Sequence, residues 1–215
     1  MSILITGANR GIGAGLLAHY RAAGAEVTGT SRRPAAGCEQ MDVTEPVSTT
    51  ALAGRLEGRA IELLICNAGV YLDKGRDVTG AYDPETFADT FAVNVTGVFL
   101  TVQAFLPHLR KASVPRIAIV ASAMASSERA PGGAYAYRSS KAAAVNLGRN
   151  LAVDLKPLGV AVGIYHPGWV RTDMGGAGAS IDVDTAVAGL TARFEALTLA
   201  RTGCFLNYDG AAIPF

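Results

Sequence analysis

The sequence has little of the material from which disulfide frameworks and zinc sites are built. Its 215 residues include three cysteines, Cys38, Cys66 and Cys204, which are far apart and have no CxxC spacing. An odd number of scattered cysteines argues against a disulfide scaffold and against a zinc site. We therefore expect no metal, and we interpret the cysteines as small thiols in a reduced compartment.

Charge is scarce and evenly spread. Charged residues make up 17% of the chain, the formal net charge is +1, and the basic residues form no runs. Neither nucleic acid nor a membrane is expected as a partner, and we find no apolar run of membrane-spanning length. A strand-like segment at 2–6 follows Met1 directly and leaves no room for a signal or transit peptide, so the expected location is cytoplasmic.

Hydrophobic residues make up 50% of the chain, and its length suits a single domain, 1–215, with a substantial core. Short β-branched runs alternate with longer segments of helical period. The predicted strands are 2–6, 25–30, 39–42, 61–66, 116–121, 160–165 and 203–207, and the predicted helices are 12–23, 47–57, 85–111, 135–156 and 183–199. This alternation predicts an α/β fold in which helices cover both faces of a parallel sheet of about seven strands.

A glycine-rich turn lies between the first predicted strand and the first predicted helix. It reads Thr6-Gly7-Ala8-Asn9-Arg10-Gly11-Ile12-Gly13. Glycines at this place permit a tight turn and let a pyrophosphate approach the free amides of the helix start. A dinucleotide site is therefore predicted here.

The end of the second predicted strand indicates which dinucleotide. An acidic residue there would bind the ribose hydroxyls of NAD, whereas arginine accommodates the 2′-phosphate of NADP. The sequence is Thr30-Ser31-Arg32-Arg33, with no carboxylate, and Arg10 supplies a further cation toward the same phosphate. NADP(H) is favoured, and NAD(H) stays as the alternative.

Tyr137 and Lys141 are four residues apart in a predicted helix, so their side chains share one face. The ammonium of Lys141 favours the phenolate, and we expect it to lower the pKa of Tyr137 by about 1–3 units. Such a phenol could give or take a proton near neutral pH.

These motifs occur in order with Asp42-Val43, Asn67-Ala68-Gly69, Asn94, Ser122 and Pro167-Gly168. Together they resemble the short-chain dehydrogenase/reductase family, which has a Rossmann-type doubly wound fold. The likeness runs from Ile3 to Phe215. The stretches 135–143, 166–174 and 203–210 resemble its smaller carbonyl-reductase branch, which includes sniffer-like and C-factor-like proteins.

The resemblance implies a role for each matching residue. The cofactor would be bound by the glycine turn, the second strand end and the loops after later strands, through Gly7, Asn9, Arg10, Gly11, Ile12, Gly13, Ser31, Arg32, Asp42, Val43, Asn67, Ala68, Gly69, Tyr137, Lys141, Pro167, Gly168, Val170 and Thr172. The catalytic residues would be Tyr137 as proton donor, Ser122 holding the substrate oxygen, Lys141 at the nicotinamide ribose, and Asn94 placing a water that links Lys141 to solvent.

Two alternatives accompany these roles. Ser126 and Ser127 are rivals of Ser122, which is preferred because it directly follows a buried strand, at the edge where ligands bind in open α/β sheets. His166 could be a base, but an orienting or packing role is favoured. The glycine- and alanine-rich stretch 175–180 predicts a mobile substrate loop near 170–182.

The sequence thus predicts an enzyme that transfers hydride between NADP(H) and a carbonyl or alcohol substrate, in the reducing direction. The alternative is a regulatory or signalling protein of the same fold that binds the dinucleotide with little turnover. Helical segments 94–111 and 135–156 form dimer or tetramer contacts in many similar proteins, whereas the sniffer-like branch also includes monomers. A homo-oligomer is favoured, and a monomer stays as the alternative.

Overall fold

The computed structural model describes all 215 residues and contains one seven-stranded sheet in which every strand is parallel to its neighbours. The order is β3-β2-β1-β4-β5-β6-β7, so the winding direction reverses between β1 and β4. The strands are β1 (Ser2–Ile5), β2 (Glu26–Ser31), β3 (Cys38–Gln40), β4 (Leu63–Cys66), β5 (Arg116–Val120), β6 (Ala161–His166) and β7 (Cys204–Asn207). The predicted α/β fold is confirmed.

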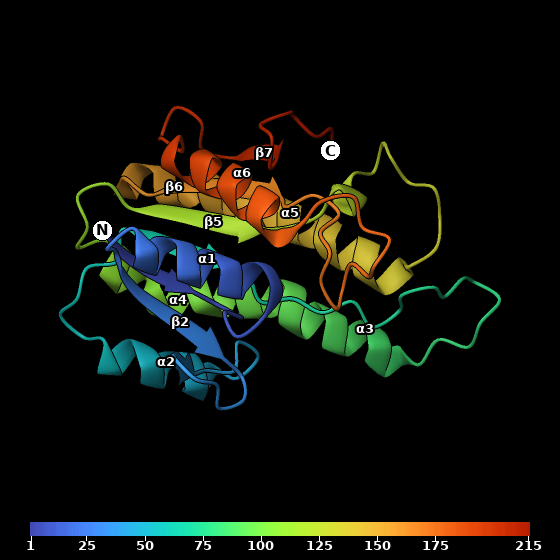
Figure 1. Ribbon diagram of the computed structural model, residues 1–215, viewed down its shortest axis with the longest axis horizontal. Coiled ribbons are helices and arrows are strands. Elements are labelled where there is room, and N and C mark those ends of the chain that lie inside the picture. Colours follow the sequence, from blue (N-terminus) through green and yellow to red (C-terminus); the bar gives the residue numbers. More distant parts are fainter.

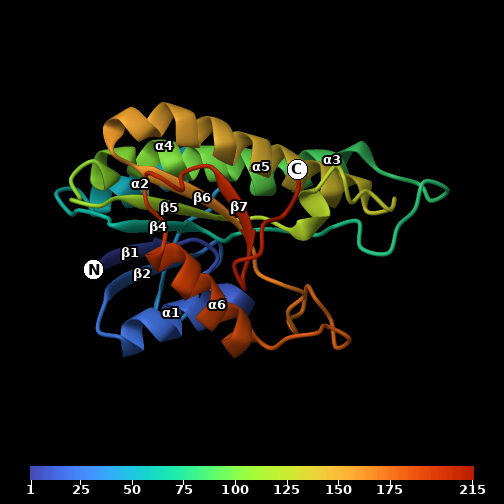
Figure 2. The ribbon, with the colours of Figure 1, turned by 90° about the horizontal axis from the view of Figure 1, so that it is seen from above.

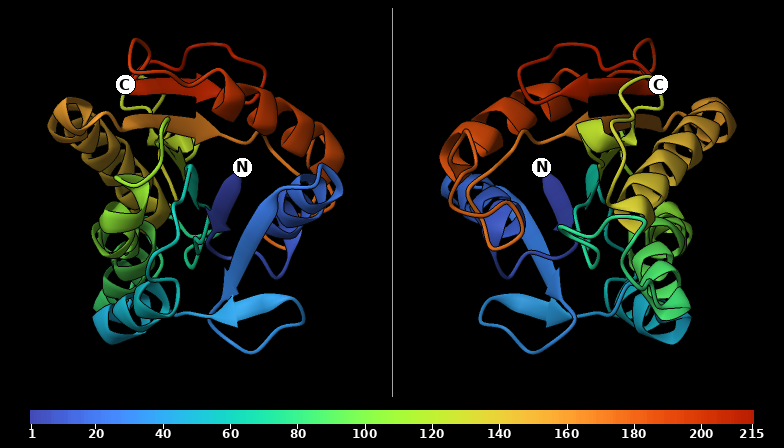
Figure 3. Two further views of the ribbon diagram at one scale, coloured as in Figure 1. Left: turned by 90° about the vertical axis from the view of Figure 1, so that its left-hand side faces the viewer. Right: turned by 90° about the vertical axis from the view of Figure 1, so that its right-hand side faces the viewer.

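Helices cover both faces of the sheet (Figures 1 and 2). Helices α2, α4 and α5 lie on one face, and α1 and α6 lie side by side on the other (Figure 2). End-on views show the same two layers flanking the twisted sheet (Figure 3). The helices are α1 (Gly11–Ala22), α2 (Pro46–Arg55), α3 (Pro84–Phe91), α4 (Gly97–Leu109), α5 (Tyr135–Leu155) and α6 (Val183–Glu195).

Alternate side chains of each strand enter different cores. In β1, Leu4 belongs to a cluster of 25 buried residues on the side of α4 and α5, whereas Ile3 and Ile5 belong to a cluster of 14 with residues of α1 and α6. Both faces of the strand are therefore buried, which explains the nearly continuous apolar runs.

The predicted helix 85–111 is interrupted. It consists of α3, a five-residue π-turn at Ala92–Thr96, and α4. A π-turn inserts one extra residue into the helical register, an irregularity that helical periodicity alone does not reveal.

The same stretch corrects a second expectation. Pro84–Leu109 is 26 residues long and contains an 18-residue window with a mean hydropathy of 1.4, enough by length and composition alone to cross a membrane. Core helices share this composition, and Phe105 and Leu109 of α4 lie in the larger core cluster.

The carboxyl ends of the strands all face one edge, where the long loops 67–83, 121–134 and 167–182 gather (Figures 1 and 2). Ligands of open α/β sheets bind at this edge, near the point where the strand order reverses. The fold therefore brings the predicted site residues to one place.

Candidate active site

The glycine turn is folded tightly against the loop that follows β4. Gly7 and Gly11 have φ angles of +65° and +53°, in the region that favours glycine. A Cβ atom on Gly13 would overlap the Gly7 carbonyl oxygen. Asn67 braces the turn, because its Nδ2 donates to the carbonyl oxygens of Thr6 and Gly7 at 3.0 Å each.

The start of α1 fits a dinucleotide pyrophosphate. No side chain caps this helix, and its first turn carries no acidic residue. Its first amides and the positive end of its dipole therefore remain free for an anion. Asn9 and Ile12 lie in the same turn, and the Thr172 methyl group lies 3.3 Å from where a Cβ of Gly11 would be. The loop after β6 thus faces the glycine turn.

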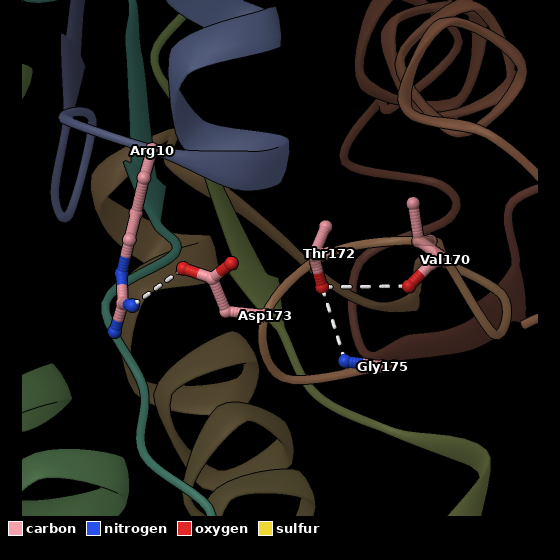
Figure 4. Close-up of polar contacts among 5 residues, drawn as sticks. All are labelled: Arg10, Val170, Thr172, Asp173 and Gly175. Atoms are coloured by element: carbon pink, nitrogen blue, oxygen red, sulfur yellow. Dashed lines mark hydrogen bonds and ion pairs between the residues drawn. The ribbon is translucent and has the colours of Figure 1, made fainter. Parts of the chain in front are cut away.

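The end of β2 carries cations and no carboxylate. Ser31 is buried, whereas Arg32 and Arg33 are exposed and make no ion pair. Arg10 has a partner that the sequence did not predict: it binds Asp173 at 2.9 Å across the space between the glycine turn and the loop after β6 (Figure 4). Arg32 and Arg33 therefore remain the unpaired cations at this strand end.

Asp42 and Val43 follow β3. The Asp42 Oδ1 atom accepts hydrogen bonds from the Thr44 amide and hydroxyl at 2.9 and 2.8 Å, so the turn itself orients this carboxyl group. Val43 is buried beside the start of α4, where a Cβ on Gly97 would lie only 2.8 Å from Val43 Cγ2. Both residues lie at the carboxyl edge, as predicted.

Ser122, Tyr137, Lys141 and Asn94 meet at this edge although they come from three elements. Their exposed fractions are 5%, 7%, 5% and 1%. Lys141 Nζ lies 5.8 Å from the centroid of the Tyr137 ring and donates to the Val120 carbonyl oxygen at 3.0 Å. Ser122 starts a 3₁₀ turn (Ala123–Ala125), where its Oγ accepts from the Met124 amide at 3.1 Å, and its hydroxyl is near enough to Tyr137 to influence the pKa of the phenol.

Asn94 lies in the π-turn and joins the loop after β4 to α5. It exchanges two hydrogen bonds of 2.9 Å with the backbone of Val70, and its Nδ2 donates to Ser140 Oγ at 3.0 Å. A Cβ on Gly69 would lie 3.3 Å from Asn94 Oδ1 and 3.4 Å from Lys141 Nζ. Asn94 and Lys141 are therefore neighbours across Gly69, and π-turns often occur at functional sites.

The pKa values of Tyr137 and Lys141 differ from the expectation. Burial raises the pKa of Tyr137 to about 12, and the polar influence of the Ser122 side chain opposes this rise only in part. Burial also lowers the pKa of Lys141 to about 8. Desolvation is the largest cause of both shifts, so the expectation that Lys141 lowers the pKa of Tyr137 is wrong for the protein alone. Tyr137 keeps its proton at neutral pH.

The rival residues have ordinary structural roles. Ser126 Oγ is buried and accepts from the Arg129 amide at 3.2 Å, and Ser127 is exposed. Burial lowers the pKa of His166 to about 4, so this residue is a weak base. Among the three serines, the structure brings Ser122 to Tyr137.

The loop after β6 is held by its own polar contacts. Gly168 has a φ of +88° and packs against Ile181 and Tyr208. Thr172 Oγ1 accepts from the Gly175 amide at 3.1 Å and donates to the Val170 carbonyl oxygen at 3.4 Å (Figure 4). Movement of segment 170–182 stays a prediction.

Sequence reasoning missed one contributor to the site. Asp73, in the loop after β4, accepts hydrogen bonds from the backbone amides of Ala136 and Tyr137 at 2.8 and 3.2 Å. The neighbouring Tyr71 ring stacks on the Tyr137 ring, with centroids 4.1 Å apart and planes at 18°. A lone acid in a polar loop gives no signal of a partner 64 positions away, so only the fold reveals it.

The chain also resembles known proteins. Residues 1–180 match the family model for short chain dehydrogenases. The protein called C-signal of Myxococcus xanthus is 38% identical over 157 residues, which cover 72% of this chain and 93% of that protein.

Solved structures agree over the whole chain. The carbonyl reductase Sniffer of D. melanogaster has a TM-score of 0.92 at 29% identity, with 100% of this chain and 99% of that chain covered. The NADPH-bound carbonyl reductase from chicken fatty liver has a TM-score of 0.90 at 29% identity, with 100% and 98% covered. The chain therefore belongs to the short-chain dehydrogenase/reductase family, as an NAD(P)-dependent oxidoreductase of the branch that holds the sniffer-like and C-signal-like proteins.

Proposed function

We propose that this protein is an NADPH-dependent carbonyl reductase. The observation that carries the proposal is the buried group of Ser122, Tyr137, Lys141 and Asn94 beside the uncapped start of α1. It puts a neutral proton donor and a cation next to a site that fits a dinucleotide. NADPH supplies a hydride when it is bound there.

The protein's own groups would act on the oxygen of the substrate. As negative charge develops on that oxygen, the Ser122 and Tyr137 hydroxyls stabilise it and Tyr137 gives up its proton. A phenol whose pKa is raised to about 12 is protonated at neutral pH, which suits the reducing direction. Asn94 and Lys141, adjacent across Gly69, would lead a replacement proton to Tyr137.

NADPH is favoured by the cations at the end of β2. Arg32 and Arg33 are exposed and unpaired, and no carboxylate stands at this strand end to repel a 2′-phosphate. The binding of NADPH by the chicken carbonyl reductase supports the same choice. Titration of the wild type with NADPH and NADH tests it: tighter binding of NADPH is expected, and Arg32→Glu should remove that preference. A wild type that prefers NADH would contradict the assignment.

Turnover is tested with a panel of aliphatic and aromatic ketones and aldehydes, followed by NADPH absorbance. Tyr71 stacks on the Tyr137 ring, and Tyr135, Trp169 and Met174 are exposed in segments at the carboxyl edge of the sheet. These side chains favour apolar and aromatic carbonyl compounds. Tyr137→Phe should lower kcat by at least about 100-fold and leave NADPH binding intact, because it removes only the proton donor. A Tyr137→Phe variant with wild-type kcat would overturn the proposed role.

The likeness to C-signal keeps a second candidate, a dinucleotide-binding signalling protein with little turnover. The Tyr137→Phe variant separates the two, because a binding module would keep its biological activity without the phenol.

We also propose a cytoplasmic location, where the three free cysteines stay reduced, and a homo-oligomer, which light scattering would test.

A further inference from the structure

The position of Tyr137 depends on how α5 begins, because the phenol stands only two residues after the first residue of that helix. Ala134 precedes the helix with φ and ψ of 49° and 48°, a left-handed conformation that non-glycine residues rarely adopt. Neither Ala134 nor any acidic residue in the first turn caps the helix. The sequence around α5 therefore leaves its first amides without a local partner.

A carboxyl group from a distant loop takes that place. Asp73 is 0% exposed, its Oδ2 accepts from the Ala136 amide at 2.8 Å, and its Oδ1 accepts from the Tyr137 amide at 3.2 Å. The Tyr82 hydroxyl donates to the same Oδ2 at 3.4 Å. An anion at a helix start is stabilised by the free amides and by the helix dipole, which offsets the burial of an acid that has no cationic partner.

The loop that carries Asp73 also holds the Tyr137 side chain. The Tyr71 ring stacks on the phenol ring at 4.1 Å, and two hydrogen bonds join the Val70 backbone to the Asn94 side chain. Segment 70–73 thus contacts the ring of Tyr137, its amide, and the neighbouring Asn94. A shift of this segment would move the proton donor relative to Ser122.

We propose that Asp73 is a positioning residue that fixes the reactive phenol of Tyr137 by binding the backbone amide of the same residue. Asp73 acts through α5, since its two carboxyl oxygens face helix amides. A misplacement of about 1 Å in a reacting group can lower a rate by about 100-fold. The inference rests on the proposed reductase function.

The test compares Asp73→Ala and Asp73→Asn with a matched cap variant elsewhere. Asp83 caps α3 by accepting from the Glu85 amide at 2.9 Å, and Asp83→Ala removes a cap that does not touch Tyr137. For each variant, kcat and KM are measured with one carbonyl substrate of the wild type. Urea unfolding gives stability, and NADPH titration gives the Kd and the fraction of protein that binds.

We expect Asp73→Ala to lower kcat per NADPH-binding molecule by about 10- to 100-fold, with the KM and the NADPH Kd changed less than about threefold. The kcat of Asp73→Asn should lie between those of the wild type and Asp73→Ala, because the amide oxygen of asparagine keeps one acceptor. Asp83→Ala also loses a helix cap, so it should lower the urea midpoint, but it should keep the wild-type kcat.

Wild-type kcat in Asp73→Ala overturns the inference, and so does a fall matched by Asp83→Ala. If Asp73→Ala does not fold, Asp73→Asn decides by the same criterion. A wild type that reduces no carbonyl compound overturns the proposed function instead. The exchange rate of the Tyr137 amide, measured by NMR in Asp73→Asn, then tests the cap directly: faster exchange supports it, and an unchanged rate contradicts it.

Discussion

Two helices that begin at the same edge of the sheet use their first amides in opposite ways. Helix α1 begins at Gly11 with no side-chain cap and no acid in its first turn. Helix α5 begins at Tyr135 beneath the buried carboxyl group of Asp73. An open start binds an anionic ligand, and a filled start fixes the residues that follow it.

The difference extends to the way each region is built. Around α1, glycines bring backbone close to backbone, so Gly13 packs on the Gly7 carbonyl group. Around α5, side chains with polar groups are buried together, among them Lys141 and Asn94. The first region depends on the absence of side chains, and the second depends on polar partners for side chains that are present. Substitutions should therefore affect the two regions in different ways.

The largest effect on NADPH binding is expected for Gly13→Ala, because the added Cβ disrupts the contact of Gly13 with the Gly7 backbone. The new Cβ would overlap the Gly7 carbonyl oxygen and lie 2.6 Å from Asn67 Nδ2. We expect the free energy of unfolding to fall by about 1–3 kcal/mol and the NADPH Kd to rise on the order of 100-fold. Urea unfolding and fluorescence titration measure both.

Gly54→Ala is the matched control, because Gly54 is exposed in α2 and a Cβ there meets nothing within 4 Å. A helix position of this kind gains about 0.5–1 kcal/mol from alanine. If Gly13→Ala and Gly54→Ala changed the free energy of unfolding and the NADPH Kd equally, the close backbone contact at Gly13 would not be required by the glycine turn.

A second prediction converts the open start of α1 into a filled one. Arg10 occupies the cap position with φ and ψ of −158° and 169°, the extended conformation of a residue that caps a helix. Arg10→Asp should stabilise the protein by about 1 kcal/mol and weaken NADPH binding by about 10-fold or more, because its carboxylate occupies the amides and repels phosphate.

Arg10→Ala is the control, since it removes the cation without adding an acceptor. It should weaken NADPH binding less and bring no gain in stability. If Arg10→Asp and Arg10→Ala bind NADPH equally well, the first amides of α1 are not the phosphate site.

A third prediction concerns the burial of charge in the α5 region. Burial lowers the pKa of Lys141 from 10.5 to about 8, so below pH 8 the folded protein contains a charge that it disfavours. Between about pH 8 and 10.5 the unfolded chain binds more protons at this lysine, and stability rises with pH. Lys141→Met should therefore be more stable than the wild type by about 2–3 kcal/mol at pH 7, and inactive.

The difference in stability between Lys141→Met and the wild type should narrow as the pH rises from 8 toward 9.5. Urea unfolding at several pH values measures this difference. Val145→Met, one turn further along α5 at a buried position that carries no charge, is the control and should show a constant difference. If the stability difference between Lys141→Met and the wild type also stayed constant with pH, burial would not lower the pKa of Lys141.

The sequence predicts the α1 region better than the α5 region, and the reason is the range of the interactions. A glycine turn after a strand is a local signal, so the seven strands and the residues of the turn could be predicted. The Tyr137–Lys141 pair is also local. Asn94 could be placed at the site only through the family resemblance, because its neighbours come from distant segments. For Ser122 the resemblance was supported by its place directly after a buried strand.

What escaped prediction depends on tertiary contact. The bonds of Asp73 to α5, the ion pair of Arg10 with Asp173 and the π-turn at Asn94 join or distort segments that no spacing relates. The raised pKa of Tyr137 escaped for the same reason, since the amount of burial is set by everything packed around the ring. Local sequence patterns predicted the helices and strands, whereas long-range contacts determine the positions and pKa values of the site residues.

The smallest effect is expected at the contact between the glycine turn and the loop after β6. The side chains of Arg10 and Asp173 are 69% and 80% exposed, so their pair contributes less than about 1 kcal/mol to stability. Asp173→Asn should leave the urea midpoint unchanged and tighten NADPH binding by about twofold at low salt, because it frees Arg10 and removes a negative charge near the phosphate site. High salt should abolish the difference, since screening weakens exposed charges. Weaker NADPH binding by Asp173→Asn would mean that the Arg10–Asp173 pair holds the start of α1 in the conformation that binds NADPH. A side chain would then fix the start of α1, as Asp73 fixes the start of α5, and the contrast between the two helices would be lost.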